Sequence, residues 1–234
     1  MTVDDDPGLP PGDAAWGVAL ADDLAATPRQ YHRAGDHLFG EGDPSTDVFF
    51  VHQGLVKIVK TATDGKQAIV ALLGAGGLVG EHAAIDGLPR GTGAVAATDV
   101  VTARLARRHV LAAVDRDGDV AREILSRFTG QLRSTTRDVL ALATGDSVTL
   151  IAARLAELVS GPMFAALRST DGRGVIVVEM PISQQELASW AGVSHRSAAS
   201  ALQELRTAGV ITTGRLHVEV LDPAALAQRA AGPG

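Results

Sequence analysis

Near the C-terminus, apolar residues recur at helical spacing in two short segments joined by a tight turn. The first segment opens at Ser183 and the second at Ser194, and serine is a favourable helix N-cap. Glu186 completes a capping box with Ser183, and Gly192 stands where the chain must turn sharply. The inward face of the second segment is expected to hold Ala198, Ala201, Leu202 and Leu205. The pattern over 183–211 predicts a helix-turn-helix, which places one helix in the DNA major groove.

The opposite face of the second helix is polar and comprises His195, Arg196, Ala199, Ser200, Gln203 and Arg206. Such side chains suit base edges and phosphates, although an ordinary helical hairpin with a solvated polar face has the same pattern. Two short alternating runs follow at 210–212 and 216–220, separated by the turn Thr213-Gly214-Arg215. They predict a β-hairpin, the wing of a winged helix, and this context favours the DNA-binding interpretation.

The N-terminal half has the periodicity of strands. Short apolar runs cover 47–51, 54–60, 67–73 and 93–105, and turn residues such as Asp64-Gly65 separate them at intervals of roughly ten residues. This spacing predicts an antiparallel sandwich or a barrel-like roll.

Between the two halves lies a long helical stretch, from about residue 119 to residue 143. Its narrow seam consists of Ile124, Phe128, Leu132, Thr135, Val139 and Leu142. The spacing approximates a coiled-coil seam and favours a parallel dimer helix, while a single amphipathic helix packed on its own domain is the alternative. Gly145 is the expected hinge, and Asp146 is expected to cap a further helix over 147–160.

Composition narrows the class of protein. The chain has 234 residues, enough for two modest domains, and no apolar run is long enough to span a bilayer, so no membrane partner is expected. The acidic, Pro- and Gly-rich start opposes a signal peptide and predicts a disordered leader and a cytoplasmic location. Cysteine is absent, which excludes disulfides and cysteine-ligated clusters. The sequence has no nucleophile elbow, Walker motif, catalytic dyad or metal-spaced histidine pair, so we expect neither an enzyme nor a metal site.

The net charge of −6 does not by itself suggest a nucleic-acid partner. Residues 146–234 carry 7 Lys and Arg against 8 Asp and Glu, so positive charge must be concentrated on the docking face. The candidates are Arg173, Arg196, Arg206 and Arg215. So few phosphate contacts predict modest non-specific affinity, and a symmetric dimer would double the footprint.

A strand-rich N-terminal half, a long helix and a C-terminal winged helix, in this order, resemble the cyclic-AMP receptor protein/FNR (Crp/Fnr) family of bacterial transcription factors over about residues 28–222. The motifs that carry the resemblance are Gly35-Asp36-His37-Leu38-Phe39, Glu41-Gly42-Asp43, the run 47–51 followed by Gly54, Asp64-Gly65, and Gly76-Gly77-Leu78-Val79-Gly80-Glu81. The resemblance implies an α+β fold with a cyclic-nucleotide-binding-type β-roll (a double-stranded β-helix or jelly roll), a long central dimerisation helix and a C-terminal winged helix-turn-helix. The implied boundaries are a leader at 1–27, the roll at 28–117, the dimerisation helix and hinge at 118–145, and the DNA-binding domain at 146–234.

The resemblance also implies an effector pocket. Gly80 and Glu81 match the pair that opens the family's phosphate-binding cassette, whose glutamate accepts the ribose 2′-hydroxyl. Arg90 matches the arginine that meets the cyclic phosphate. Gly91 and Thr92 stand where cyclic-AMP binders have Ser or Thr and then Ala, so the hydroxyl beside the phosphate is lost at Gly91 and Thr92 is its substitute.

Two further hydroxyl residues, Thr135 and Thr136, match the positions that contact the adenine, one of them across the dimer. Cyclic AMP or another cyclic nucleotide is therefore the expected effector. The resemblance also allows a haem with His82 or His37 as its ligand, although an ordinary surface or hydrogen-bonded histidine is favoured at both positions. The alternative is a degenerate pocket, in which Glu81 and Arg90 form a scaffold salt bridge and the protein answers to another ligand or binds DNA without one.

The resemblance also identifies, by their position in the second helix, the residues of this chain that would read DNA bases. His195, Arg196 and Ser200 stand where the best-known member has base-reading Arg, Glu and Arg, so a different operator is expected. Arg196 is the candidate for a bidentate guanine contact, and the residues suited to positioning on the backbone are Ser183, Gln185, Ser194 and Arg206. The implied partners are double-stranded DNA with two-fold-related half-sites, a second copy bound through the 119–143 helix, and RNA polymerase.

Overall fold

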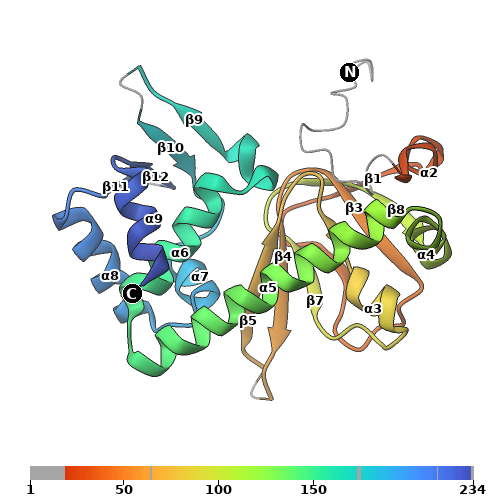
Figure 1. The fold of residues 1–234 in the computed structure, drawn as a ribbon, viewed down its shortest axis with the longest axis horizontal. Helices are drawn as coiled ribbons and strands as arrows, with labels where there is room; N and C mark the ends of the chain where they lie inside the picture. The colour runs from red at the N-terminus through yellow and green to blue at the C-terminus, as the bar shows by residue number, and fades with distance from the viewer. Residues whose placement is uncertain (1–18, 64, 173–174, 215, 233–234) are drawn as a thin grey trace. The chain divides into compact units, whose positions relative to one another are not determined.

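The structure, a computed structural model, describes residues 19–63, 65–172, 175–214 and 216–232. Most of the expected leader (1–18), Asp64 of the expected turn, and the candidate arginines 173 and 215 lie outside the described residues. The chain forms two compact units, one of Met1–Gln67 with Ala71–Phe128 and the other of Ala68–Val70 with Thr129–Gly234 (Figure 1). The boundary between the units falls inside one long helix.

Two four-stranded sheets form the first unit. The first sheet has the order β1-β8-β3-β6, with β1 Arg29–His32, β8 Val100–Ala106, β3 Asp47–Gln53 and β6 Leu78–Val79. The second has the order β2-β7-β4-β5, with β2 His37–Phe39, β7 Gly93–Ala96, β4 Val56–Thr61 and β5 Gln67–Leu73. The pairs β1–β8, β8–β3, β3–β6, β2–β7 and β7–β4 are antiparallel, which confirms the predicted roll. The predicted run over 93–105 is divided between the two sheets, because the chain bends at 97–98.

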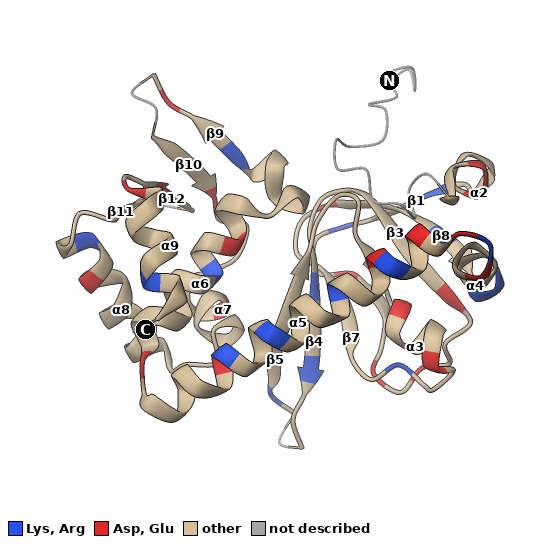
Figure 2. Ribbon diagram, viewed as in Figure 1, with Lys and Arg blue, Asp and Glu red and all other residues tan. Residues whose placement is uncertain are grey.

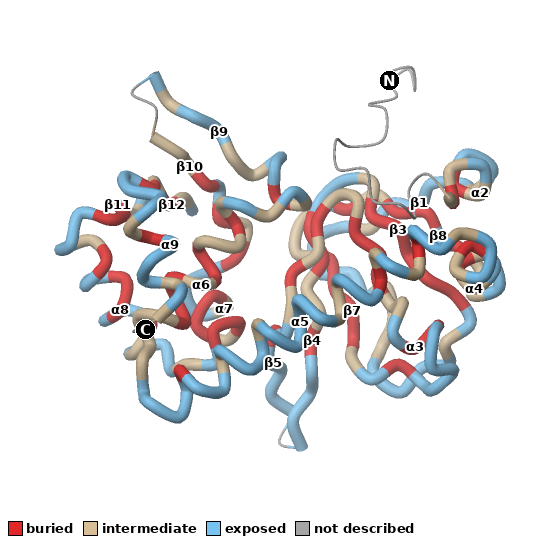
Figure 3. Tube along the Cα trace, in the orientation of Figure 1, coloured by how far each residue is buried: buried red, intermediate tan, exposed pale blue. Residues whose placement is uncertain are grey.

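Strand β3 is buried on both faces and joins two apolar clusters (Figure 3). Successive side chains of a strand point to opposite faces. Phe49 and Val51 therefore enter one cluster, with Val56, Val79, Ala94, Ala96 and Val100. Val48 and Phe50 enter the other, where helices cover the first sheet. These helices are α2 Ala21–Ala26, α3 Glu81–Asp86, α4 Arg107–Arg116 and the start of α5.

Helix α2 differs from the expected disordered leader. Leu20 and Leu24 are buried in the helix-covered cluster, and Arg116 of α4 donates to the carbonyl oxygen of Ala19 at 2.9 Å. Burial of two leucines stabilises this segment, although the acidic residues before it resemble a solvated tail. The ordered fold therefore begins before residue 28.

Helix α5, Gly118–Thr144, agrees with the predicted long helix, but its N-terminal seam prediction was wrong. Ile124 is buried in the core of its own unit, and Phe128 packs against the same cluster. Leu125, which lies outside the predicted seam, is 64% exposed, and the predicted seam residues Leu132 and Val139 are 67% and 60% exposed. These three residues are seven positions apart and form an exposed apolar stripe along α5. The stripe begins at Leu125, one residue after Ile124, where the predicted seam began.

The second unit is a winged helix. Its helices are α6 Ser147–Ser160, the 3₁₀ helix η1 Pro162–Leu167, α7 Gln184–Trp190, α8 His195–Thr207 and α9 Pro223–Ala231. Its sheet has the order β11-β12-β10-β9, with β9 Arg168–Thr170, β10 Ile176–Glu179, β11 Ile211–Gly214 and β12 His217–Val220. The predicted hairpin over 210–220 is confirmed by the β11–β12 pairing.

Within this unit a buried arginine ties the end of α5 to the helix-turn-helix. Arg154 of α6 pairs with Asp138 of α5, and its Nη1 lies 3.2 Å from Oε2 of Glu157. Its guanidinium also lies over the ring of Trp190 in α7, 5.5 Å from the ring centroid. Burial raises the pKa of Glu157, and the neighbouring Arg154 opposes that rise. One cation thus joins three helices.

Candidate effector pocket and nucleic-acid interface

The expected phosphate cassette begins with a close backbone approach at Gly80. This residue has φ +91°, in the left-handed region, and immediately precedes helix α3 Glu81–Asp86. A Cβ atom at this position would lie 2.9 Å from Cζ of Arg90 and 3.3 Å from Cε1 of Phe39. Only glycine fits both the backbone angle and the space, and the structure places Gly80 in contact with Arg90.

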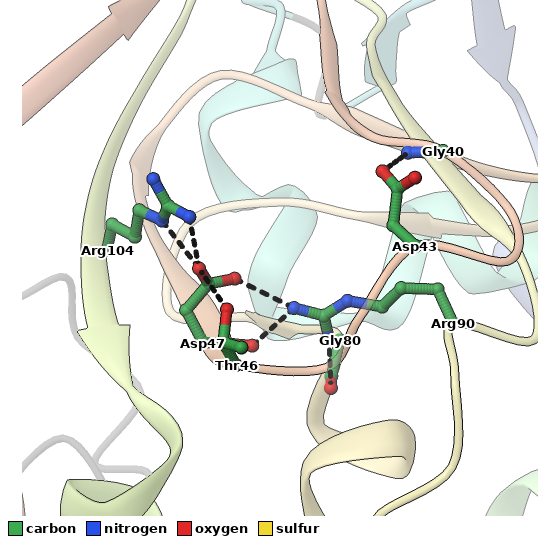
Figure 4. A network of polar contacts seen from close by, with 7 residues as sticks. All are labelled: Gly40, Asp43, Thr46, Asp47, Gly80, Arg90 and Arg104. Atoms are coloured by element: carbon green, nitrogen blue, oxygen red, sulfur yellow. Dashed lines mark hydrogen bonds and ion pairs between the residues drawn. The ribbon is translucent and has the colours of Figure 1, made fainter.

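Arg90 is enclosed by a polar network (Figure 4). Its Nη1 donates to the carbonyl oxygen of Gly80 at 2.7 Å, and its Nη2 donates to Oδ1 of Asp47 at 2.9 Å and to the carbonyl oxygen of Asp47. The side chain of Arg90 is 1% exposed, and its guanidinium lies over the ring of Phe39 at 4.2 Å. Among the described residues no acceptor pairs with its buried Nε. Burial lowers the pKa of Arg90, and Asp47 opposes that shift.

The carboxylate of Asp47 forms ion pairs with two arginines, Arg90 and Arg104. Arg104 donates from Nε to Oδ2 of Asp47 at 2.7 Å, and the Arg104 side chain is 53% exposed. The sheet explains this contact, because Asp47 is opposite Ala106 in the β3–β8 register and Arg104 is two residues along on the same face. One carboxylate therefore lies between a buried and a half-exposed guanidinium.

Glu81 does not form the ion pair with Arg90 that the degenerate-pocket alternative supposed. Its carboxylate lies 3.5 Å from Nε2 of His82, and the ring of His82 meets that of Phe128 in α5 edge to face, with centroids 4.8 Å apart. Burial raises the pKa of Glu81, and the charges of His82 and then Arg127 oppose that rise. The cassette helix α3 is thus in contact with the start of α5.

The remaining predicted pocket residues are less enclosed. Gly91 is exposed and its carbonyl oxygen accepts a hydrogen bond of 2.8 Å from Nζ of Lys60, while Thr92 is half-buried. Thr135 and Thr136 are exposed on the part of α5 that belongs to the second unit. The hydroxyl of Thr136 donates to the carbonyl oxygen of Leu132 at 2.9 Å, one turn earlier in the helix.

The helix-turn-helix is built by the local signals in the sequence. Ser183 and Glu186 form the predicted capping box at α7, and the hydroxyl of Ser194 caps α8 by accepting from the backbone N–H of Ser197 at 3.0 Å. Gly192, in the turn, has a backbone angle φ of +71°. Residues with a β-carbon rarely adopt this angle, so the turn favours glycine. The cap hydroxyls are therefore engaged, and Ser183, Gln185 and Ser194 are exposed at the ends of the two helices.

The outer face of α8 is polar and open. Exposed residues on it are His195, Arg196, Ala199, Ser200 and Gln203, while Ala198, Ala201, Leu202 and Leu205 are buried. Arg196 makes no hydrogen bond or ion pair with any described residue. Arg206 is half-buried and already bonded to Gln203 and Thr213. Figure 2 shows acidic and basic residues scattered over this unit. Among the described residues on the outer face of α8, Arg196 is an exposed cation with no protein partner.

The sequence does not predict Asp47 and Phe39 as partners of Arg90, or Arg104 as the second partner of Asp47. Asp47 was assigned to the start of an apolar strand, where a carboxylate is normally unfavourable unless it is paired. A charged residue at the end of a buried strand was the available signal. Its partner is 43 residues away in the chain, and no spacing rule links the two.

In the described part of the chain no helix is long and apolar enough to cross a membrane, and no group of three His, Asp or Glu side chains could hold a metal ion.

Comparison with known proteins finds two families along the chain. The cyclic nucleotide-binding domain matches residues 29–117, and the Crp-like helix-turn-helix domain matches residues 151–229. The chain is 28% identical over 207 residues to the cyclic AMP receptor protein of Thermus thermophilus, covering 87% of this chain and 88% of that protein. It is 26% identical over 196 residues to a CRP-like cAMP-activated global transcriptional regulator of Mycobacterium tuberculosis, covering 84% and 85% of the two chains.

The fold is similar to that of solved structures. A crystal structure of a transcriptional regulator of the CRP/FNR family from Thermus thermophilus has a TM-score of 0.68 and 26% identity, covering 88% of this chain and all of that one. FixK2 from Bradyrhizobium japonicum has a TM-score of 0.71 at 22% identity, covering 89% and 99% of the two chains.

Proposed function

The chain belongs to the Crp/Fnr family of transcriptional regulators, and from this premise we propose that it acts as a homodimer that places two α8 helices in DNA when its β-roll binds a cyclic nucleotide. Family members of this kind are effector-controlled DNA-binding proteins rather than enzymes. The proposal specifies which residues contact DNA and effector, the dimeric state and the identity of the effector. It takes 28–117 as the sensor, 118–145 as the dimerisation helix and hinge, and 146–234 as the DNA-binding domain.

The observation that supports DNA recognition most directly is the open face of α8. The helix is fixed from behind by buried Ala198, Leu202 and Leu205, and Arg196 has no protein partner among the described residues. A rigid helix with a free guanidinium can read guanine O6 and N7. We assign the base contacts to His195, Arg196 and Ser200.

We assign contacts to the DNA phosphate backbone to residues at the ends of the two helices. Ser183, Gln185 and Ser194 are exposed there, and backbone N–H groups at helix N-termini favour phosphate. Arg206 contributes through its bonds to the wing rather than as a free cation.

The exposed stripe on α5 supports the proposed dimerisation. Leu125, Leu132 and Val139 repeat every seven residues and are more than half exposed in the single chain. A second copy packed along the stripe would remove this apolar surface from water. Two recognition helices would then meet successive major grooves, about one DNA turn apart.

For the effector we propose cyclic AMP first, held by Glu81 at the ribose and Arg90 at the phosphate, with Gly91 and Thr92 beside the phosphate and Thr135 and Thr136 at the adenine. The names of the Thermus and Mycobacterium relatives support cyclic AMP as the first ligand to test. The ligand would shift the dimer between two arrangements by its differential affinity for them.

A second candidate function is favoured by the Arg90–Asp47 ion pair. An arginine that already has an anionic partner suits a pocket that answers to another ligand, or that leaves DNA binding constitutive. Calorimetric titration of the purified chain with cyclic AMP and cyclic GMP separates the two candidates, when it is combined with selection of binding sites from random DNA. Heat of binding together with tighter DNA binding supports the first candidate; sequence-specific binding with no heat and no change in affinity supports the second.

The proposal extends to location and partners. A regulator of chromosomal genes works in the cytoplasm, and an activating role would include contact with RNA polymerase. Transcription in vitro from a selected site, with and without the protein, tests that contact.

A further inference from the structure

We propose that Asp47 is a specificity-determining residue of the effector pocket, whose carboxylate takes the position on Arg90 that a ligand's phosphate requires. The inference rests on the proposed function, in which the β-roll binds the effector and Arg90 meets its phosphate. It adds an internal anion that competes with the ligand. Phosphate-bearing ligands then bind only by displacing Asp47.

The donors of Arg90 explain why Asp47 and a phosphate exclude each other. A guanidinium offers an anion two forks, one made by Nη1 and Nη2 and the other by Nε and Nη2. Nη2 belongs to both forks. It donates one hydrogen bond to the carboxylate oxygen Oδ1 of Asp47 and another to the backbone carbonyl oxygen of the same residue. Nη1 donates to the carbonyl oxygen of Gly80. While Asp47 stays in place, no complete fork is free for a phosphate.

Because Arg90 is buried, replacing the Asp47 carboxylate by a ligand phosphate is more favourable than removing the carboxylate alone. Its side chain is 1% exposed and one face is covered by Phe39. Removing Asp47 without a replacement would leave a buried, unpaired cation, which is strongly unfavourable. A phosphate that takes the vacated position restores the pairing, so ligand entry and Asp47 displacement belong to one step.

Arg104 gives the displaced carboxylate a partner. It already donates to Oδ2 of Asp47, the oxygen that Arg90 does not use. Because the Arg104 side chain is 53% exposed, Asp47 can keep this ion pair while it moves away from Arg90 towards solvent. Asp47 thus has a bonded arrangement in both the empty and the filled pocket.

The test compares full-length wild type with Asp47→Asn, titrated with cyclic AMP and, separately, with inorganic phosphate as the smallest probe of the anion position. Asparagine keeps the size of the side chain and removes the competing charge. We expect both probes to bind at least about tenfold more tightly to the variant, and the gain to vanish in the Asp47→Asn, Arg90→Gln double variant. Asp119→Asn is the matched control, because Asp119 is exposed on α5 and pairs with Arg122; we expect it to match wild type.

The two probes separate this inference from the proposed effector. If phosphate binds the variant more tightly, Arg90→Gln cancels the gain, and cyclic AMP binds neither protein, Asp47 keeps its role and the cyclic-AMP proposal fails. Equal affinities of wild type and Asp47→Asn for both probes overturn the role of Asp47, whether or not cyclic AMP binds.

A melting experiment decides the matter if Asp47→Asn folds poorly. Phosphate should then replace the missing anion and raise the Tm of the variant more than that of wild type, compared with chloride at matched ionic strength. Equal shifts for the two proteins overturn the inference.

Discussion

Arg206 in the recognition helix donates a hydrogen bond of 2.8 Å to the hydroxyl of Thr213 in the wing. Its other terminal nitrogen donates to Oε1 of Gln203 at 2.7 Å. A residue expected to contact phosphate is therefore occupied in joining α8 to β11. We therefore expect Arg206 to affect DNA binding through the position of the wing.

Thr213→Val tests this joint. Valine keeps the shape and removes the acceptor, so we expect a loss of about 0.5–1.5 kcal/mol in the free energy of unfolding. DNA affinity should fall by a similar factor for every sequence, because no base contact changes. Chemical denaturation and DNA titration measure the two effects. Thr212→Val, one residue earlier on the same strand, is the control, and a loss confined to one operator position would contradict the idea.

Arg196→Ala is expected to weaken DNA binding by about 1–3 kcal/mol and to relax the preference at one position in each half-site. The reason is that a bidentate contact to guanine carries sequence information, whereas a phosphate contact does not. Binding-site selection with the variant measures the change in preference. Arg229→Ala removes a charge in the same unit, from an ion pair with Glu204, and should leave the preference intact. A uniform loss over all sequences would assign Arg196 to phosphate instead.

Leu132→Glu should prevent the proposed dimer from forming, because it places a charge in the middle of the exposed stripe on α5. Sedimentation would then show a monomer, and DNA affinity would fall steeply as half of the footprint is lost. Arg137→Glu changes an exposed residue on the same helix outside the stripe and should remain dimeric. Dimers of unchanged stability in Leu132→Glu would exclude α5 as the interface.

Gly80→Ala is expected to destabilise the β-roll and abolish the effector response. Its Cβ would collide with the guanidinium of Arg90, and the backbone angle of +91° disfavours a side chain. Gly130→Ala is the matched control, since a Cβ there meets nothing within 4 Å and should stabilise α5 by about 0.5–1 kcal/mol. Thermal melting separates the two, and equal effects would show that the space around Gly80 can relax.

Glu81 predicts a pH dependence of stability. Burial raises its pKa above the ordinary value near 4.5, so the folded state binds the proton more tightly than the unfolded chain does. As pH rises through that window, this group lowers the free energy of unfolding. Glu81→Gln resembles the protonated form, so it should gain stability relative to wild type as pH rises above about 4.5. Urea denaturation at several pH values measures the difference, and a difference independent of pH would refute the assignment.

The local features of the fold were readable from sequence, and the non-local ones were not. Ser183 with Glu186, and Asp146 at the start of α6, act within four residues, so their caps could be assigned. Ile124 and Leu125 are both apolar neighbours on α5, and only the packing of a distant sheet decides which of them is buried. The Asp47–Arg90 pair depends on strand register across 43 residues. Periodicity carries no information about such a pair.

Helix α5 contributes residues to both units of the chain. Its 27 residues form a rod about 40 Å long, at roughly 1.5 Å per residue. Val120, Ile124 and Phe128 hold one end in the core of the first unit, and Asp138 holds the other to Arg154 of the second. Because one helix contributes to the cores of both units, a substitution that unfolds either core also removes support from the end of α5 that packs there, and the two units are expected to lose stability together.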